Sequence, residues 1–232
     1  MFNNKILLSV LLIFSVFAFV GAQQSRSETT AEEDYLSTFE DMIINELTIS
    51  DELDNKVLAL QYIEEALEND TGSRDLTQIQ TSLSSLAGEG VLSQARTNGR
   101  LTNDYPQVRA EACRLLGKIN SPESRDTLTK IALAEKESWV AASAIKSLGE
   151  ISQDESDEAV ATIAWVEKKY AVINPSSSLA FEILNAYEKL APTVIDKSPL
   201  IQSISKIAVN YYYTTSVRDK AKALLKKYTG KK

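Results

Sequence analysis

Apolar residues recur at intervals of three and four along most of the chain, which is the spacing of one face of an α-helix. No segment has the period-two alternation that is typical of a half-buried strand. The prolines fall at the edges of the helical patterns, where a missing backbone N–H breaks no helical hydrogen bond. The pattern therefore predicts an all-α protein made of helices joined by short polar turns.

One helical segment occurs twice in the sequence. Residues 108–119 (VRAEACRLLGKI) return 32 positions later as residues 140–151 (VAASAIKSLGEI), and agreement at this offset continues to residue 168. Self-similarity with a period of about 20 to 50 residues indicates stacked structural repeats. Because one helix pair cannot bury its apolar face alone, we expect antiparallel helix pairs stacked into an α-solenoid.

Further copies follow these two. Residues 178–191 keep the apolar spacing but lack the glycine of the first two copies. Residues 217–225 closely match the start of the first copy in sequence. Gly117 and Gly149 recur at one repeat position inside helical patterns, where glycine costs about 1 kcal/mol relative to alanine. We therefore expect neighbouring helices to approach closely at these glycines. The predicted structural positions are Asp104, which is expected to cap a helix, and Val108, Arg109, Ala112, Leu116, Gly117, Val140, Ala144, Leu148, Gly149, Val217 and Leu225.

The N-terminal residues have the layout of a secretory signal peptide. Lys5 precedes an apolar run over residues 6–20, and small residues follow it before Gln23. An uncleaved membrane anchor is the alternative, although the run is short for a membrane span. The expected organisation is a signal peptide at 1–22, a flexible leader at 23–30, acidic helices at 31–100, and a repeat array at 104–232 that ends in a basic capping helix. We expect export to a bacterial periplasm or out of the cell.

Two N-terminal segments have less regular patterns. Tyr35, Phe39, Met42, Ile43 and Leu47 fall at helical spacing and are expected to form one apolar stripe. Residues 91–100 are expected to form a short helix that ends in a loop at the Asn-Gly pair.

Charge is unevenly distributed along the chain. Acidic residues outnumber basic residues by 32 to 25, which argues against a nucleic-acid-binding protein. Residues 28–71 carry a net charge of −13, whereas residues 200–232 carry +7. This asymmetry indicates either two differently solvated ends or ends that meet partners of opposite sign, including each other.

The sequence contains no constellation that is typical of a catalytic or metal site. It has no histidine, which removes the commonest general base and metal ligand. Cys113 is the single cysteine, and Ile145 takes its place in the second copy, so it is expected to be a buried apolar residue. The acidic run at 154–158 lacks the glycine and spacing of an EF-hand loop. No catalytic residue, cofactor or metal is predicted.

Two tryptophans and the C-terminal tyrosines are the candidates for binding a partner. Trp139 and Trp165 each lie beside a residue of the apolar stripe, so packing is the first expectation and an exposed binding anchor is the alternative. The C-terminal tyrosines fit either turn packing or a binding patch with the basic residues that follow. The candidate partner surface comprises Tyr212, Tyr213, Arg218, Lys222 and Lys226.

The motif Asp104-x-Pro-x-Val108-Arg109-x-x-Ala112-x-x-Leu115-Leu116-Gly117 resembles the first helix of HEAT repeats, especially the short bacterial kind. The resemblance implies a right-handed superhelix of two-helix repeats, whose second helices line a concave face that grips a partner protein. It also implies that Asp104 and Arg109 link neighbouring repeats. Ala141 replaces the arginine in the second copy, so a continuous polar ladder is not expected.

Three functional classes remain open from the sequence. The favoured one is a non-catalytic, exported interaction scaffold whose partner is another protein. The second is an envelope-binding module whose basic C-terminal helix touches anionic lipid or cell-wall polymer, which limits membrane contact to the periphery. The third is a lyase-type enzyme, since some HEAT-like proteins act on chromophores. The export signal and the lack of histidine make this third class the weakest.

Overall fold

A computed structural model describes residues 31–70, 72, 74–152 and 156–230 of the chain. The expected signal peptide and leader lie outside these residues, as does part of the acidic run at 154–158. The described helices are α2 (Ala31–Ile49), α3 (Leu53–Asn69), α4 (Thr77–Gly88), α5 (Pro106–Leu116), α6 (Pro122–Ala134), α7 (Ser138–Ile151), α8 (Ser156–Ile173), α9 (Ser177–Leu190), α10 (Ser198–Val209) and α11 (Thr215–Thr229).

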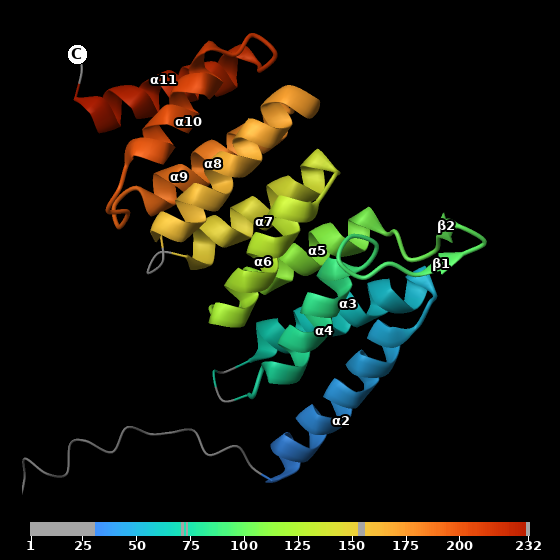
Figure 1. The fold of residues 1–232 in the computed structure, drawn as a ribbon. Helices are drawn as coiled ribbons and strands as arrows, with labels where there is room; N and C mark the ends of the chain where they lie inside the picture. Colours follow the sequence, from blue (N-terminus) through green and yellow to red (C-terminus); the bar gives the residue numbers. More distant parts are fainter. Residues whose placement is uncertain (1–30, 71, 73, 153–155, 231–232) are drawn as a thin grey trace, which may run out of the picture.

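The helices form two parallel layers of one stack (Figure 1). The first layer contains α3, α5, α7, α9 and α11, and the second layer contains α2, α4, α6, α8 and α10. Each helix contacts the previous and the next helix of its own layer, and also neighbours in the other layer. The predicted all-α solenoid of stacked antiparallel pairs is confirmed, and the N-terminal helices belong to the same stack.

A single apolar core runs through the whole stack, from Ile44 on α2 to Leu224 on α11. The predicted apolar positions of the repeats lie in this core, except Leu225, which is only partly buried on α11. Cys113 is fully buried there, and its burial raises the pKa of the thiol. The thiol is therefore protonated and inert at neutral pH.

Neighbouring first-layer helices approach most closely at the two repeat glycines. A Cβ atom on Gly117 would lie 2.7 Å from the Cβ atom of Ser147 on α7. A Cβ atom on Gly149 would lie 2.8 Å from the Cα atom of Ala186 on α9. Both distances are shorter than carbon atoms tolerate, so these positions exclude any side chain. The predicted close approach is confirmed.

The start of α5 differs from its prediction. Asp104 does not cap the helix: the N-cap residue is Tyr105, and it makes no side-chain capping bond. The Asp104 carboxylate instead accepts a hydrogen bond from Nη1 of Arg109 at 2.7 Å. Helix α6, by contrast, has a side-chain cap, because Ser121 Oγ accepts a hydrogen bond from the Ser124 N–H at 3.0 Å. At the start of α5 a buried arginine binds the carboxylate, whereas among the described residues no buried arginine competes for the serine hydroxyl at the start of α6.

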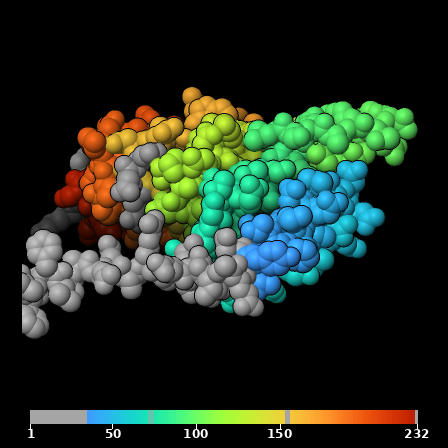
Figure 2. All heavy atoms as spheres, turned by 90° about the horizontal axis from the view of Figure 1, so that it is seen from below, coloured from blue at the N-terminus to red at the C-terminus, as the bar shows by residue number. Residues whose placement is uncertain are grey.

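The expected short helix within residues 91–100 is wrong. Strands β1 (Arg96–Thr97) and β2 (Arg100–Leu101) pair antiparallel and project from the edge of the stack (Figure 2). Asn98 and Gly99 connect them with φ angles of 52° and 80°. Positive φ at both central residues is the geometry of the two-residue hairpin turn that an Asn-Gly pair favours.

Helix α2 carries its apolar stripe, but the stripe points away from the stack. Tyr35, Phe39 and Met42 are 71%, 54% and 65% exposed. The inward side contributes Ile44 to the core, and beside it Arg74 pairs with Asp41 and with Glu40, the latter at 2.6 Å. Helical periodicity predicts that an apolar face exists, but contacts with α3 and α4 decide which side of α2 packs against the stack.

Among the described residues, no helix has the length and the apolar character needed to cross a membrane.

Helix α8 buries a carboxylate that lacks a complete set of partners. Glu167 is fully enclosed, and its Oε2 atom accepts no hydrogen bond. Burial raises the pKa of Glu167, and the charge of Lys206 on α10 lowers it by a smaller amount. The folded state therefore disfavours the ionised form of Glu167 more than the unfolded state does. As the pH rises above 4.5, the pKa of this group in the unfolded chain, the raised pKa lowers the stability of the fold.

We expect Glu167→Gln to raise the melting temperature at pH 7 by a few degrees, because it removes the cost of this ionisation. The difference should shrink as the pH falls and vanish below about pH 4, where the carboxyl is protonated in both states. Circular-dichroism melts across this pH range measure it. Exposed Glu158→Gln on the same helix is the control and should change nothing, and equal melting temperatures for Glu167→Gln and wild type at pH 7 would contradict the expectation.

Candidate partner-binding groove

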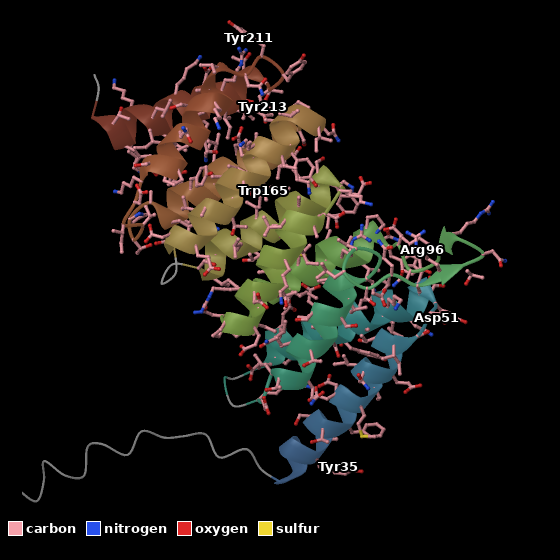
Figure 3. All side chains as sticks on the ribbon, viewed as in Figure 1. Tyr35, Asp51, Arg96, Trp165, Tyr211 and Tyr213 are labelled. Atoms are coloured by element: carbon pink, nitrogen blue, oxygen red, sulfur yellow. The ribbon has the colours of Figure 1, made fainter. Side chains whose placement is uncertain are left out.

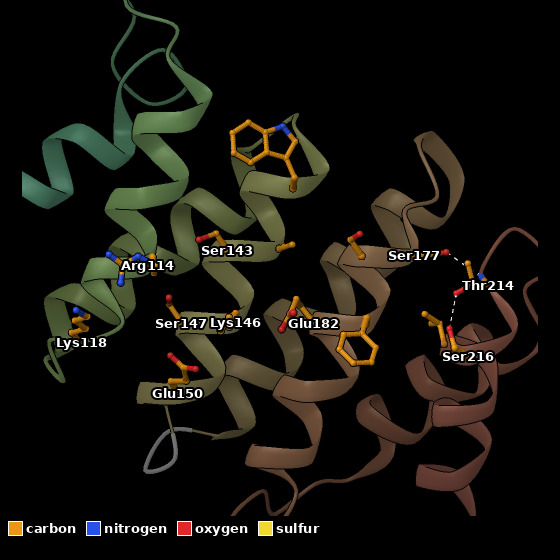
Figure 4. A pocket seen from close by; sticks show the side chains of 15 residues that line it. Arg114, Lys118, Ser143, Lys146, Ser147, Glu150, Ser177, Glu182, Thr214 and Ser216 are labelled. Atoms are coloured by element: carbon orange, nitrogen blue, oxygen red, sulfur yellow. Dashed lines mark hydrogen bonds between the residues drawn. The ribbon is translucent and has the colours of Figure 1, made fainter. Parts of the chain in front are cut away.

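A groove of about 750 Å³ crosses the outer face of the first layer, from α5 over α7 and α9 to the start of α11 (Figure 4). Its lining comprises Arg114, Lys118, Trp139, Ala142, Ser143, Lys146, Ser147, Glu150, Ser177, Ser178, Phe181, Glu182, Thr214, Ser216 and Val217.

Small side chains form the floor of the groove, because the first-layer helices are too close together for large ones. Ser147 faces Gly117 across the α5–α7 contact. Ser143 donates a hydrogen bond to the backbone oxygen of Ala110 at 2.7 Å, which satisfies its hydroxyl and ties α7 to α5. The tight packing that the glycines permit therefore also leaves the surface hollow above it.

Two aromatic side chains rise from this floor. Trp139, in the first turn of α7, is 47% exposed, and Phe181 on α9 is 42% exposed. The Lys220 ammonium group from α11 lies 5.0 Å from the centre of the Phe181 ring. The expected inward packing of Trp139 is wrong, because the residue lies one step around the helix from buried Val140. Half-exposed aromatics in a concave surface are typical binding anchors.

The charges in the groove fall into two groups. Arg114 and Lys118 are engaged by Glu64 of α3, at 2.5 and 3.3 Å. Lys146 on α7 and Glu182 on α9 form no ion pair within the described residues, and Figure 4 places them on neighbouring helices in the middle of the groove. In the described structure, the groove therefore offers one cation and one carboxylate that could each form an ion pair with a bound partner.

The second tryptophan lies elsewhere. Trp165 is half exposed on α8, in the second layer, so its expected inward packing is also wrong. The Lys169 ammonium group lies 5.7 Å from its ring centre. Lys169 also donates to the backbone oxygens of Leu133 and Glu135, at 2.9 and 2.6 Å, and so satisfies the end of α6. The partial burial of Lys169 lowers the pKa of its ammonium group.

A ladder of buried ion pairs runs along the edge where second-layer helices lead into first-layer helices. The fourth residue of α3, Lys56, pairs at 2.6 Å with Glu89, which directly follows α4. The fourth residue of α5, Arg109, pairs at 2.8 Å with Glu135, which directly follows α6. Arg109 also donates to the backbone oxygen of Glu89 at 3.2 Å. We call these contacts the polar ladder.

Arg109 is the centre of this ladder and is only 2% exposed. Burial lowers its pKa, but hydrogen bonds to Glu135 and Asp104 outweigh that effect, so the pKa is raised overall. Ala141 and Ala180 occupy the same position on α7 and α9, so the ladder is interrupted there, as the sequence predicted from Ala141. Tyr170 continues the contact from α8 by donating to the Glu135 backbone oxygen at 2.9 Å.

The candidate surface at the C-terminal tyrosines is only partly assembled. Tyr212 is exposed, as is Tyr211 beside it. Tyr213 is 4% exposed and packs in the core, so its place in a partner surface is wrong. Arg218 lies over the Tyr211 ring at 5.7 Å from the ring centre. Lys222 and Lys226 are exposed on α11, and Lys222 pairs with Asp219 at 2.9 Å.

No group of three or more acidic, histidine or cysteine side chains in the described part of the chain is arranged to hold a metal ion.

Stacked helix pairs, close-packing glycines and a groove along one layer define a helical-repeat protein. Residues 94–173 match the family model of HEAT repeats, which confirms the resemblance of the first-helix motif to these repeats over this part of the chain. HEAT repeats generally mediate protein–protein interactions and are typically non-catalytic. No curated protein and no solved structure matches the chain.

Proposed function

We propose that this protein is an exported, non-catalytic scaffold that binds a segment of another protein in the groove of the first layer. The observation that carries the proposal is the groove itself. It joins two exposed aromatic anchors, Trp139 and Phe181, to an unpaired cation and an unpaired carboxylate, Lys146 and Glu182. These groups lie on rigid helices, so they are positioned before a partner arrives.

The chemistry of the groove favours a peptide segment as its occupant. The floor offers hydroxyl groups and small apolar side chains, which suit a backbone that approaches closely. An apolar partner side chain between Trp139 and Phe181 would supply the main burial, and flanking charges of opposite sign would pair with Lys146 and Glu182. This location differs from the second-helix surface that the resemblance to HEAT repeats implied.

Export is supported by the pattern at residues 1–22. A basic residue, a short apolar run and small residues before Gln23 are arranged as in a cleavable signal peptide. Export implies that the partner is also in the periplasm or outside the cell. Recovery of the chain from that compartment with Gln23 as its first residue tests this part of the proposal.

The groove is tested by site-specific photo-crosslinking in the producing cells. A photo-reactive amino acid at Trp139 is expected to capture one defined protein, whereas the same group at Ile195, which is exposed outside the groove lining, should capture none. Phe181→Ala and Lys146→Glu should each weaken the affinity for the captured protein by about tenfold or more, because both contacts lie at the centre of the groove.

Val172→Ala, another exposed apolar substitution away from the groove lining, is the matched control and should leave that affinity unchanged. The same set of captured proteins at Trp139 and Ile195, or an affinity insensitive to Phe181 and Lys146, would refute binding in the groove.

A basic C-terminal helix that touches anionic lipid or cell-wall polymer is the alternative function. Helix α11 exposes Lys222, Lys226 and Lys227. Its charge is partly neutralised, since Asp219 pairs with Lys222 and Glu188 lies 3.8 Å from Lys227. Because these pairs reduce the positive charge that α11 offers to an anionic surface, the groove is the favoured binding site.

A further inference from the structure

The outward face of α2 is an apolar surface that the described helices leave uncovered. Tyr35, Leu36, Phe39, Met42 and Ile49 are all more than half exposed on it. Several large apolar side chains gathered on one exposed face are typical of a protein–protein contact site.

We propose that this face packs against the opposite end of a second copy, so that the chains associate head to tail. In this arrangement α2 of one copy lies beside α10 and α11 of the next copy, in the place of a further second-layer helix. The stack holds α2 and α11 at opposite ends of one molecule, so the contact forms between copies (Figure 1).

Charge selects this pairing over a contact between two α2 helices. The segment that contains α2 carries −13 over residues 28–71, whereas residues 200–232 carry +7. Two α2 faces would bring like charges together, which costs affinity and slows encounter. Head-to-tail contact brings opposite charges together at every interface.

The alternating direction of the helices sets the register of the contact. All second-layer helices run the same way, so the loops that follow them lie along one edge of the stack. Glu89 and Glu135 lie in such loops, after α4 and α6, and supply the carboxylates of the polar ladder. Ser50 directly follows α2, and the carboxylates of Asp51 and Glu52 come one and two positions later in the same loop; both side chains are exposed, and Figure 3 labels Asp51.

The cation that would meet these carboxylates is Arg218. It is the fourth residue of α11, the position that Lys56 and Arg109 occupy on α3 and α5. Unlike them, Arg218 has no ion pair within the described residues: Nη2 donates to Thr215 Oγ1 at 3.3 Å, and buried Nε has no hydrogen-bond partner. Asp51 and Glu52 likewise form no ion pair there. A second copy would complete this step of the ladder.

The receiving surface also carries apolar groups. Buried Ser203, Ile204 and Ile207 mark the side of α10 that faces the stack. Val209 is exposed on the other side of the helix, and Ile201, which packs partly against the core, lies at the margin between the two sides. With exposed Tyr211 and Tyr212, they provide contacts for the apolar face of α2.

Sedimentation of the purified exported chain tests the proposal, with two charge-reversal variants. One variant carries Asp51→Arg and Glu52→Arg, and the other carries Arg218→Glu and Lys222→Glu. The average mass of wild type should rise with concentration, whereas each variant alone should associate about tenfold or more weakly. An equimolar mixture should regain association, because the unaltered ends of the two variants fit each other and their reversed charges are again opposite.

Phe39→Gln with Met42→Gln should also abolish association, and Val172→Gln, at an exposed apolar site on α8, is its matched control. Circular dichroism confirms that each variant is folded. A monomeric wild type at every concentration would overturn the proposal. So would undiminished association of the Arg218→Glu, Lys222→Glu variant, which indicates contact between α2 helices, or a monomer that binds anionic phosphatidylglycerol vesicles through α11.

Discussion

Replacing Gly149 by leucine is expected to lower the free energy of unfolding by about 3 kcal/mol or more. A Cβ atom at this position would lie 2.7 Å from the Cβ atom and 2.8 Å from the Cα atom of Ala186. The second contact is with backbone, so α7 and α9 must separate to admit any side chain. Leucine gains about 1 kcal/mol of helix propensity, which is too little to offset the loss. Urea denaturation monitored by circular dichroism measures the change.

Gly88 provides the matched control for this expectation. A Cβ atom on Gly88 would meet Leu92 at 3.6 Å, an ordinary van der Waals distance. Gly88→Ala should therefore be neutral or stabilising, whereas Gly149→Ala should already destabilise. Equal stabilities for Gly149→Ala and Gly88→Ala would show that α7 and α9 are not in close contact.

Arg109→Met is expected to cost about 3 kcal/mol, because it strands the buried carboxylate of Glu135 without a cation. Glu135 is fully enclosed and would retain only the backbone N–H groups of Lys136 and Glu137, at 2.7 and 3.0 Å. Adding Glu135→Gln to Arg109→Met should recover much of the loss, since it removes the uncompensated charge. Denaturation of the two single variants and the double variant forms a double-mutant cycle.

Arg114→Met is the control for the buried pair. Arg114 also contacts two carboxylates, those of Glu64 and Glu111, but it is about one-third exposed. Exposed ion pairs contribute at most about 1 kcal/mol, so this substitution should have a small effect. A loss at Arg114 equal to that at Arg109 would contradict the importance of burial in the polar ladder.

The repeat, its buried stripes and its close-packing glycines were predictable because each is a local or periodic property. The recurrence of Gly117 and Gly149 at one repeat position is enough to indicate close helix contacts. The Asn98-Gly99 pair also carried a readable signal for a hairpin, which the expectation of a short helix ignored.

The groove and the direction of α2 were not predictable, because both depend on contacts between distant residues. Periodicity indicates an apolar face on α2, but Arg74, which binds the inward side of the helix, lies more than thirty residues from its partners Glu40 and Asp41. The exposure of Trp139 likewise depends on the neighbouring helices. The polar ladder could have been found by comparing the fourth residues of α3, α5 and α11 with the acids that follow α4 and α6.

The missing glycine of α9 has a mechanical consequence. Its twelfth residue, where the α5 and α7 repeats have glycine, is Glu188, which bridges to Lys220 and Lys227 of α11 at 3.2 and 3.8 Å. Solvated bridges yield more readily than interlocked small side chains. Under tension the α5–α7–α9 segment should therefore behave as a stiff rod, and the array should bend first between α9 and α11.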